Sequence, residues 1–263
     1  MRRAISLLLS CCILITMLTA CSANKKSDWA FRDQGDGTLE IWWYYDFKET
    51  EVVVPSEIGG KKVTRIGQSA FQGHKAMTSL TIPEGVTSIG RHMLAGCKSL
   101  TKIVFPDSLT TVDEGAFFGA TAMTDIVLPP NVKNIGELAF DWNYSLKSAT
   151  LPDGLEVLGP QAFAKCYALT DVNIPNSIKK IDDGTFYLCS SLDSVTIPDS
   201  VTYIGSRAFA GCDSLTNITI PKSVCGIGQD AFQFCRDLTI NVTAGSYAEQ
   251  YCKDNELTYK VLP

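Results

Sequence analysis

The chain has 263 residues, of which 45% are hydrophobic, and its formal net charge is −5. A chain of this length and composition can bury a sizeable core. Its acidic balance argues against a nucleic-acid-binding protein, because such proteins gather Lys and Arg into a basic stripe that neutralises phosphates.

Residues 1–20 have the pattern of a secretory signal peptide. Two arginines precede an apolar run that is too short to span a membrane. The segment ends in Leu18-Thr19-Ala20-Cys21, which is similar to the lipobox of bacterial lipoproteins. That resemblance implies lipidation of the Cys21 sulfur, and two or three acyl chains anchor a protein stably where one is marginal. The alternative is an ordinary secretory signal that happens to contain a cysteine.

Residues 21–28 are polar and predict a short lipidated tether. Residues 29–51 follow, with the turn signal Gly35-Asp36-Gly37 between two strand-like runs. The second run is dense in aromatic residues. We expect residues 29–51 to form an N-terminal cap, because the open end of a repeat array must be covered. The alternative is an aromatic platform on which a sugar stacks.

A large apolar residue followed by proline recurs every 23 residues from Ile82-Pro83 to Ile220-Pro221. An earlier copy, Val54-Pro55, lies 28 residues before Pro83. A fixed period of this size indicates a solenoid. Each unit ends in an alternating strand that the proline stops, since proline has no N–H to donate. We expect about eight coils over residues 52–243, stacked at the spacing of paired strands, about 4.8 Å.

Inside each unit a glycine and an Ala-Phe pair lie between the strands, as at Gly205 and Ala208-Phe209. Gly205 is interpreted as a bend where a side chain would be in the way. The phenylalanine of each unit should point inward, and burying such a side chain is worth about 1.5–3 kcal/mol. The predicted aromatic column contains Phe71, Leu94, Phe117, Phe140, Phe163, Phe186, Phe209 and Phe232.

The unit I-P-x-S-V-x-x-I-G-x-x-A-F-x-G-C-x-S-L-T-x-I-x-I-P resembles the BspA-type (surface antigen) bacterial leucine-rich repeat. The resemblance covers about residues 52–243. It implies a β-rich leucine-rich-repeat solenoid whose coils contain short strands and a short helical turn, capped at both ends. It implies no catalytic site. The local departures are Leu94 for Phe, Asp113 and Asp182 for Gly, and His74, Ala120 and Asn143 for Cys.

Aromatic residues occupy variable positions around the Ala-Phe turn of the middle units, where outer units have small or polar residues. Adjacent coils should bring these rings close together, and exposed aromatic clusters often contact proteins or glycans. We interpret them as a candidate binding patch; the alternative is that they shield turns that lack glycine. The patch contains Phe118, Trp142, Tyr144, Tyr167 and Tyr187.

Cysteines recur at one position of the unit, at residues 97, 166, 189, 212 and 235. We expect a ladder of buried free thiols, because free cysteine behaves as a small hydrophobic residue. A disulfide between two neighbours is the alternative outside the cytoplasm. A straight column cannot surround a metal ion tetrahedrally, so no metal site is predicted. Residues 244–263 predict a C-terminal cap, with Ser246 capping a short helix and a final strand at Tyr259–Leu262.

No catalytic triad or phosphate-binding loop is present in the sequence, so we predict neither enzymatic activity nor a cofactor. The family resemblance implies a cell-surface, lipid-anchored protein that adheres to host proteins or to other bacteria. The alternatives are an envelope scaffold that binds another bacterial protein and a glycan-binding accessory protein. We expect a monomer that binds a protein ligand and that contacts the membrane only through its lipid anchor.

Overall fold

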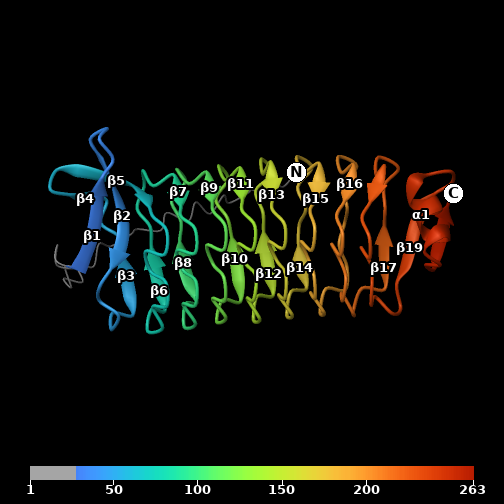
Figure 1. Cartoon of the computed structure of the whole chain (residues 1–263), viewed down its shortest axis with the longest axis horizontal. Coiled ribbons are helices and arrows are strands. Elements are labelled where there is room, and N and C mark those ends of the chain that lie inside the picture. The colour runs from blue at the N-terminus through green and yellow to red at the C-terminus, as the bar shows by residue number, and fades with distance from the viewer. Residues whose placement is uncertain (1–27) are drawn as a thin grey trace, which may run out of the picture.

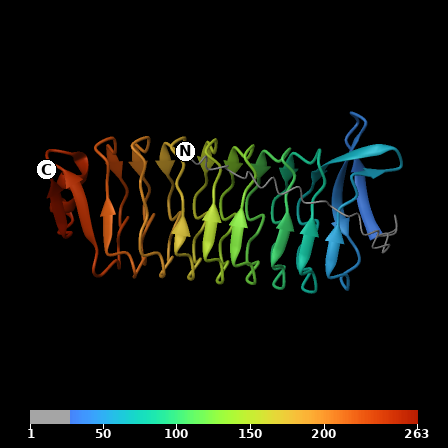
Figure 2. The ribbon, with the colours of Figure 1, turned by 180° about the vertical axis from the view of Figure 1, so that it is seen from behind.

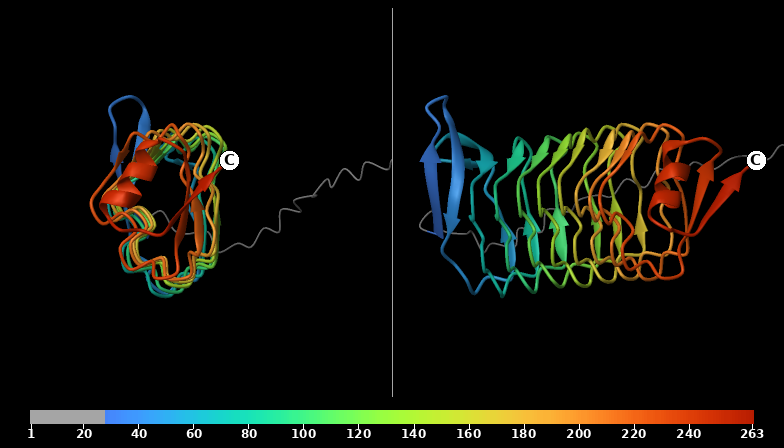
Figure 3. Two further views of the ribbon diagram at one scale, coloured as in Figure 1. Left: turned by 90° about the vertical axis from the view of Figure 1, so that its right-hand side faces the viewer. Right: turned by 45° about the vertical axis from the view of Figure 1, so that its right-hand side comes forward.

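In the computed structural model, which describes residues 28–263, successive coils stack along one axis (Figure 1). The signal peptide, Cys21 and nearly all of the tether lie outside the described residues. The stack contains about ten coils of about 23 residues, because the terminal segments continue it at both ends. The predicted leucine-rich-repeat solenoid is therefore confirmed. Viewed along the axis, the coils superpose as similar ovals (Figure 3).

The first face of the solenoid is a row of short parallel strands that end at the Ile-Pro positions. Within residues 79–172, paired strand residues lie 23 positions apart, as Ile126 and Ala149 do, and the offset changes only towards the two ends of the row. This register turns each position of the repeat into a column. The strands of the first face are β3 (Glu51–Val53), β6 (Ser79–Thr81), β8 (Lys102–Val104), β10 (Asp125–Val127), β12 (Ser148–Thr150), β14 (Asp171–Val172), β17 (Asn217–Thr219), β19 (Thr239–Thr243) and β20 (Tyr259–Leu262).

The second face is formed by the strands that precede the bend. Figure 2 shows both rows from behind. The order in one sheet is β1-β2-β5-β7-β9-β11-β13 with β4 beside β5, and β15-β16-β18 form a separate sheet. These strands are β1 (Trp29–Asp33), β2 (Thr38–Tyr44), β4 (Glu57–Ile58), β5 (Lys61–Ile66), β7 (Ser88–Ile89), β9 (Thr111–Val112), β11 (Asn134–Ile135), β13 (Val157–Leu158), β15 (Lys180–Ile181), β16 (Tyr203–Ile204) and β18 (Gly226–Ile227).

One unit departs from the pattern, because residues 192–198 form no strand. The ladder of the first face stops one coil earlier, at Asn173. The side-chain amide of Asn173 accepts a hydrogen bond from the Leu151 N–H at 2.7 Å and donates one to the Leu151 carbonyl at 2.8 Å. In other units the backbone carbonyl accepts the equivalent bond, as Val104 does from the Ile82 N–H. The Asn173 side chain thus replaces the backbone where the ladder ends.

The bend before each turn depends on glycine. A Cβ atom at Gly205 would lie 2.5 Å from the backbone of Asp182 and Asp183 in the preceding coil. Real Cβ atoms do not approach backbone atoms this closely, which supports the prediction that a side chain at Gly205 would obstruct the bend. Asp113 occupies the same column with a side chain, and its N–H still reaches the Ile89 carbonyl at 3.0 Å. The backbone can therefore adjust at single positions.

The third side of each coil, which we call the turn face, carries the Ala-Phe pair. It is a run of three overlapping tight turns rather than a short helical turn. Within one coil the N–H groups of Ala208, Ala210 and Cys212 each donate to the carbonyl three residues earlier. Alternate N–H groups donate to the next coil, as Phe209 does to Ala231 at 2.8 Å. The first and third of these turns have positive φ at their third residue, which is Arg207 (φ 54°) and Gly211 (φ 75°), respectively.

The predicted aromatic column forms the centre of the core. Its phenylalanine rings stack from coil to coil, with centroid distances from 4.9 Å for Phe117–Phe140 to 5.9 Å for Phe163–Phe186. Leu94 fills the column at its own coil and is also buried. The core is one continuous cluster along the axis rather than a set of separate cores.

Both ends of the aromatic column are covered. At the N-terminal end the rings of Trp29 and Tyr44 lie 6.0 Å and 5.7 Å from Phe71. At the C-terminal end, Tyr251 of α1 (Tyr247–Asp254) packs its ring edge-on against Phe232 at 6.5 Å. The assignment of residues 29–51 and 244–263 as caps remains a prediction.

The end of the chain follows the sequence closely. Ser246 caps α1 by accepting a hydrogen bond from the Glu249 N–H at 3.2 Å, as expected. The Glu249 carboxylate accepts from the N–H of Gly245 rather than from that of the cap residue itself. The predicted final strand is β20. Within residues 28–263, no helix is long and apolar enough to cross a bilayer.

Candidate binding surface

The turn face has a second column of residues with positive φ, in addition to the column that contains Arg207. Glycine occupies it in the outer coils, where the left-handed conformation carries no steric penalty. The middle coils and the last turn instead have bulky side chains there. The glycines are Gly73, Gly96, Gly119 and Gly211, and the other members are Trp142, Lys165, Leu188 and Phe234. Residues that hold such a conformation without being glycine cluster at functional sites.

Four of the five predicted patch residues form a row of rings across adjacent coils. Phe118 and Trp142 have their ring centroids 6.1 Å apart, and Trp142 and Tyr144 are 5.8 Å apart. Tyr144 and Tyr167 continue the row at 5.3 Å. Trp142, Tyr144 and Tyr167 are 42%, 38% and 40% exposed, so the row offers ring surface to solvent. We call these four residues the aromatic row.

A buried ion pair supports the middle of the aromatic row. Asp141 is almost fully buried beneath it, and its carboxylate lies 3.3 Å from the Lys165 ammonium group. The Lys165 ammonium also lies 5.2 Å from the Trp142 ring centroid, which is within range of a cation–π interaction. Burial raises the pKa of Asp141, and the nearby lysine offsets part of this effect. The two contacts hold Lys165 against the tryptophan ring and restrict the ring's orientation.

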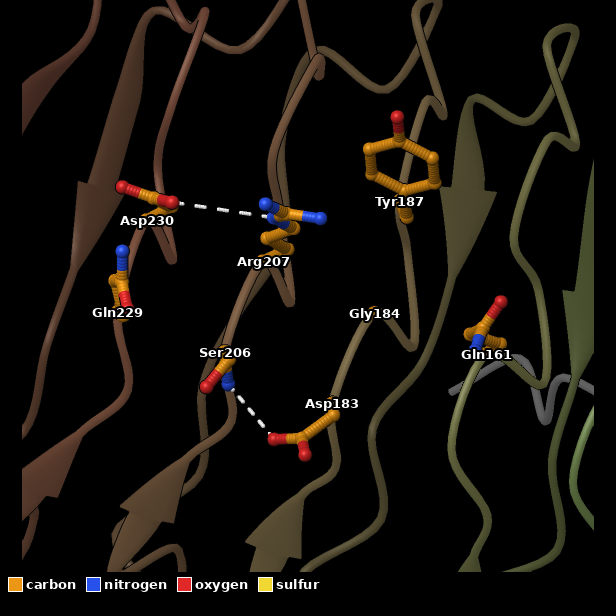
Figure 4. Close-up of a pocket in the computed structure, with 8 residues that line it drawn as sticks. All are labelled: Gln161, Asp183, Gly184, Tyr187, Ser206, Arg207, Gln229 and Asp230. Atoms are coloured by element: carbon orange, nitrogen blue, oxygen red, sulfur yellow. Dashed lines mark hydrogen bonds and ion pairs between the residues drawn. The ribbon is translucent and has the colours of Figure 1, made fainter.

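The fifth predicted residue, Tyr187, lies apart from the aromatic row. It lines a cavity of about 340 Å³ on the same face, in the next coils along the axis (Figure 4). The cavity is adjacent to the row, because the Lys165 N–H donates to the Tyr187 carbonyl. The sequence analysis did not predict the polar members of this cavity, since they occupy variable surface positions.

The cysteine column has a role that the sequence analysis missed. Each thiol donates a hydrogen bond to the carbonyl of the column phenylalanine in the preceding coil, as Cys189 does to Phe163 at 3.1 Å. Asn143 fills the same position and donates to the Phe117 carbonyl at 3.0 Å. His74, also in this column, contacts the Asp46 carbonyl. Cysteine, asparagine and histidine share a hydrogen-bond donor, and that shared property was the available signal.

All seven cysteines in residues 28–263 are free, which confirms the predicted ladder of thiols. Burial raises the pKa of Cys97 to about 12 and that of Cys235 to about 11. The thiolate is the reactive form, so these groups are unreactive at neutral pH. In this part of the chain no group of three or more His, Cys, Asp or Glu side chains could hold a metal ion.

The N-terminal cap buries part of its aromatic content and exposes the rest. Trp29 and Tyr44 are buried against Phe71, whereas Trp42 and Tyr45 are exposed. The cap interpretation accounts for the buried rings. The sugar-platform alternative stays a prediction for the exposed ones.

The pattern of coils is shared with known proteins. The model of the BspA type leucine rich repeat region matches in six copies, over residues 44–170 and 113–239. The crystal structure of the T. pallidum leucine rich repeat protein is similar, with a TM-score of 0.69 and 28% identity over 72% of this chain and 89% of that one. A leucine-rich repeat protein from Bacteroides ovatus has a TM-score of 0.65 and 25% identity, over 89% of this chain and 75% of that one. No curated protein matches the chain.

Proposed function

Because the chain belongs to the BspA-type leucine-rich repeat family, we propose that it is a cell-surface adhesion protein that binds a protein ligand through the aromatic row. Leucine-rich repeat proteins generally bind proteins, and the family and fold are typically non-enzymatic scaffolds. The ligand is a host protein or a protein of another cell. Adhesion to another cell and lipid anchoring of Cys21 are both parts of this proposal.

The observation that carries this proposal is the coincidence of exposed rings with unfavourable backbone conformation. Left-handed φ costs residues other than glycine about 1–2 kcal/mol. Trp142 has this conformation, yet its ring is not buried in the core and is 42% exposed. Exposed tryptophan and tyrosine are enriched among the residues that dominate binding energy at protein interfaces. The backbone cost at Trp142, the one member of the row with positive φ, is therefore explained if its ring contacts a partner.

The anchoring proposal rests on the N-terminal segment. Cys21 follows a signal-like stretch, and only six residues separate it from Asp28, where the described structure begins. A lipidated Cys21 would hold the N-terminal cap near the membrane and leave the turn face accessible. Replacing Cys21 by Ala should release the protein from the membrane fraction. Full retention of that variant in membranes would contradict the lipid anchor.

The binding proposal is tested by changing Trp142 and Tyr144 to Ala together. Purified protein that begins at residue 22 should capture a ligand from a set of host matrix proteins, and the double variant should lose at least about tenfold in affinity. The melting temperature is measured beside it, so that unfolding is not mistaken for lost contact. Unchanged affinity would rule out the aromatic row.

The matched control is Phe234→Ala. Phe234 is in the same column, has a similar φ of 68° and is 64% exposed, but it lies at the other end of the turn face. We expect it to retain the affinity of the unchanged protein. If the protein captures no host protein but does capture an envelope protein of its own cell, the alternative of an internal scaffold replaces adhesion.

A further inference from the structure

The cavity beside the aromatic row surrounds a coil that has glycine at a left-handed position. Gly184 lies in that column between Gln161 and Arg207, which both project side chains from equivalent positions of the neighbouring coils. The Gln161 side chain lies over the glycine, because a Cβ atom at Gly184 would be 2.9 Å from Gln161 Cγ and 3.6 Å from Tyr187 Cβ. A side chain at this position would therefore displace Gln161 from the cavity wall. Figure 4 shows the side chains around it.

Glycine alone does not create a cavity on this face. Gly115 occupies the same column three coils earlier, but the imidazole of His92 fills its space. A Cβ atom at Gly115 would lie 2.2 Å from His92 Nδ1. At Gly184 no neighbouring ring enters, and a cavity of about 340 Å³ remains. This volume is at the lower end of the range for small-ligand sites.

The cavity wall offers both donors and acceptors that the protein does not use. Among the described residues, the side-chain amide of Gln161 and the hydroxyl of Tyr187 make no hydrogen bond, and neither does the amide of Gln229. One carboxylate oxygen of Asp183 accepts from the Ser206 N–H at 2.8 Å, which leaves the other free. Arg207 approaches Asp230 only through its Nε, at 3.9 Å, so most of its donors are also free.

We propose that this cavity binds a neutral sugar unit, with the ring of Tyr187 as an apolar wall and Gln161, Asp183 and Arg207 as hydrogen-bonding partners. A sugar hydroxyl both donates and accepts, so a set of adjacent hydroxyls matches a carboxylate, an amide and a guanidinium group at once. The aliphatic side of the sugar ring can lie against Tyr187, whose ring is apolar and whose hydroxyl is polar.

The charges around the cavity disfavour an anion. Asp183 and Asp230 would repel it, and their two carboxylates outnumber the single guanidinium group of Arg207. A simple cation can donate hydrogen bonds to the carboxylates but offers no acceptor for the N–H groups of Arg207. A purely apolar ligand would strip water from these polar groups without replacing their hydrogen bonds, which is unfavourable. The site differs from the proposed protein-binding row in both its residues and its chemistry, and it does not depend on that row.

The test is saturation-transfer-difference NMR on the chain from residue 22 onward, which contains every described residue. The probes are the methyl glycosides of glucose, galactose, mannose and N-acetylglucosamine, with glucuronic acid and arginine methyl ester as charged probes. At least one neutral glycoside should bind, and Arg207→Ala should weaken it about tenfold, as expected for loss of a charge-assisted hydrogen bond. Binding of no neutral glycoside would overturn the proposal, and so would binding of only a charged probe.

A second variant closes the cavity without removing a polar group. Gly184→Asn places a side chain in the space, and asparagine tolerates the left-handed conformation. It should abolish binding. The matched control is Gly73→Asn, which has a similar φ and open space around it but is distant in the stack. Equal binding by the Gly184 and Gly73 variants would overturn the site. Trp142→Ala should leave sugar binding unchanged, which separates this test from that of the aromatic row.

Discussion

The outer and the middle coils share one turn backbone but differ in what they place on it. In the outer coils, Gly73 and Gly96 supply the second left-handed position, and in the middle coils Trp142 and Lys165 do. The buried column continues through both regions: Phe209 and Phe232 stack at 5.7 Å in the coils around Gly211, and Phe140 and Phe163 stack at 5.1 Å in the middle coils. Leu94 takes the place of a ring in one outer coil. Position in the repeat thus dictates the core, whereas the exposed turn is free to change. A large side chain at a left-handed position of the turn leaves the core unaltered but makes the backbone less favourable. Such a residue is the best indication of function on this molecule.

The largest effect should come from the shared core, and it should be equal in the two regions. Phe209→Ala in the coil of Gly211 and Phe163→Ala in the middle coils each remove a fully buried ring that is stacked on both neighbours. Each should lower the free energy of unfolding by about 3–5 kcal/mol, measured by chemical denaturation. If one variant lost less than about half as much unfolding free energy as the other, the core would not be uniform along the stack.

A smaller loss of unfolding free energy should follow when a side chain is added at the bend. A Cβ atom at Gly228 would lie 2.4 Å from the Ser206 nitrogen and 2.7 Å from the Gly205 carbonyl carbon. Overpacking of this kind costs about 1–3 kcal/mol, so Gly228→Ala should be destabilised by that amount. Asp113→Ala is the control, because this column position already contains a Cβ atom. A control that loses as much as Gly228→Ala would contradict the proposed contact.

Substitutions in the cysteine column should have a still smaller effect on stability. One of them should preserve or raise the stability of the protein and another should lower it. Asn143 donates to the carbonyls of Phe117 and Phe140, but its own Oδ1 atom is buried without a partner. Asn143→Cys restores the commoner residue and removes that oxygen, so its free energy of unfolding should equal or exceed that of the unchanged protein. Asn143→Ala leaves the carbonyls without this donor and should lose about 1–2 kcal/mol. If cysteine proved no better than alanine, the thiol would be only a filler of space.

Most of the fold could be predicted from the sequence because every coil repeats the same buried contacts. The 23-residue period gave the columns, and the register of Ile126 with Ala149 confirms it. The donor role of Cys189 was missed because cysteine reads equally well as a small apolar residue. The short helical turn was expected from the family resemblance, and the positive φ at Arg207 and Gly211 shows tight turns instead.

The candidate sites were predictable only in part, for a physical reason. The rings of Phe118, Trp142, Tyr144 and Tyr167 lie at the same side of adjacent coils, so the period alone brought them together. Tyr187 belongs to the next coil but turns to the cavity. Side chains of variable surface positions around Gly184 line that cavity, and an open space has no residue pattern of its own.

The smallest effect on stability is expected when glycine replaces a large side chain at the second left-handed position of the turn. This substitution compares the outer and the middle coils most directly. Trp142→Gly relieves a left-handed tryptophan, worth about 1–2 kcal/mol. It adds the unfolded-state entropy of glycine, about 0.5–1 kcal/mol, and it loses the contacts with Phe118 and Lys165, of similar size. These terms nearly cancel, so thermal denaturation should show a change in unfolding free energy below about 1 kcal/mol.

Phe234→Gly makes the same backbone change at a residue whose ring contacts no other ring among residues 28–263. It should therefore be more stable than Trp142→Gly, and the difference measures what the aromatic row contributes to folding. A small difference would mean that the row is maintained at the expense of backbone energy and contributes little to stability, as expected of residues kept for binding. A difference of several kcal/mol would mean that the rings stabilise the middle coils. The alternative, that these rings shield turns that lack glycine, would then replace the interpretation as a binding patch.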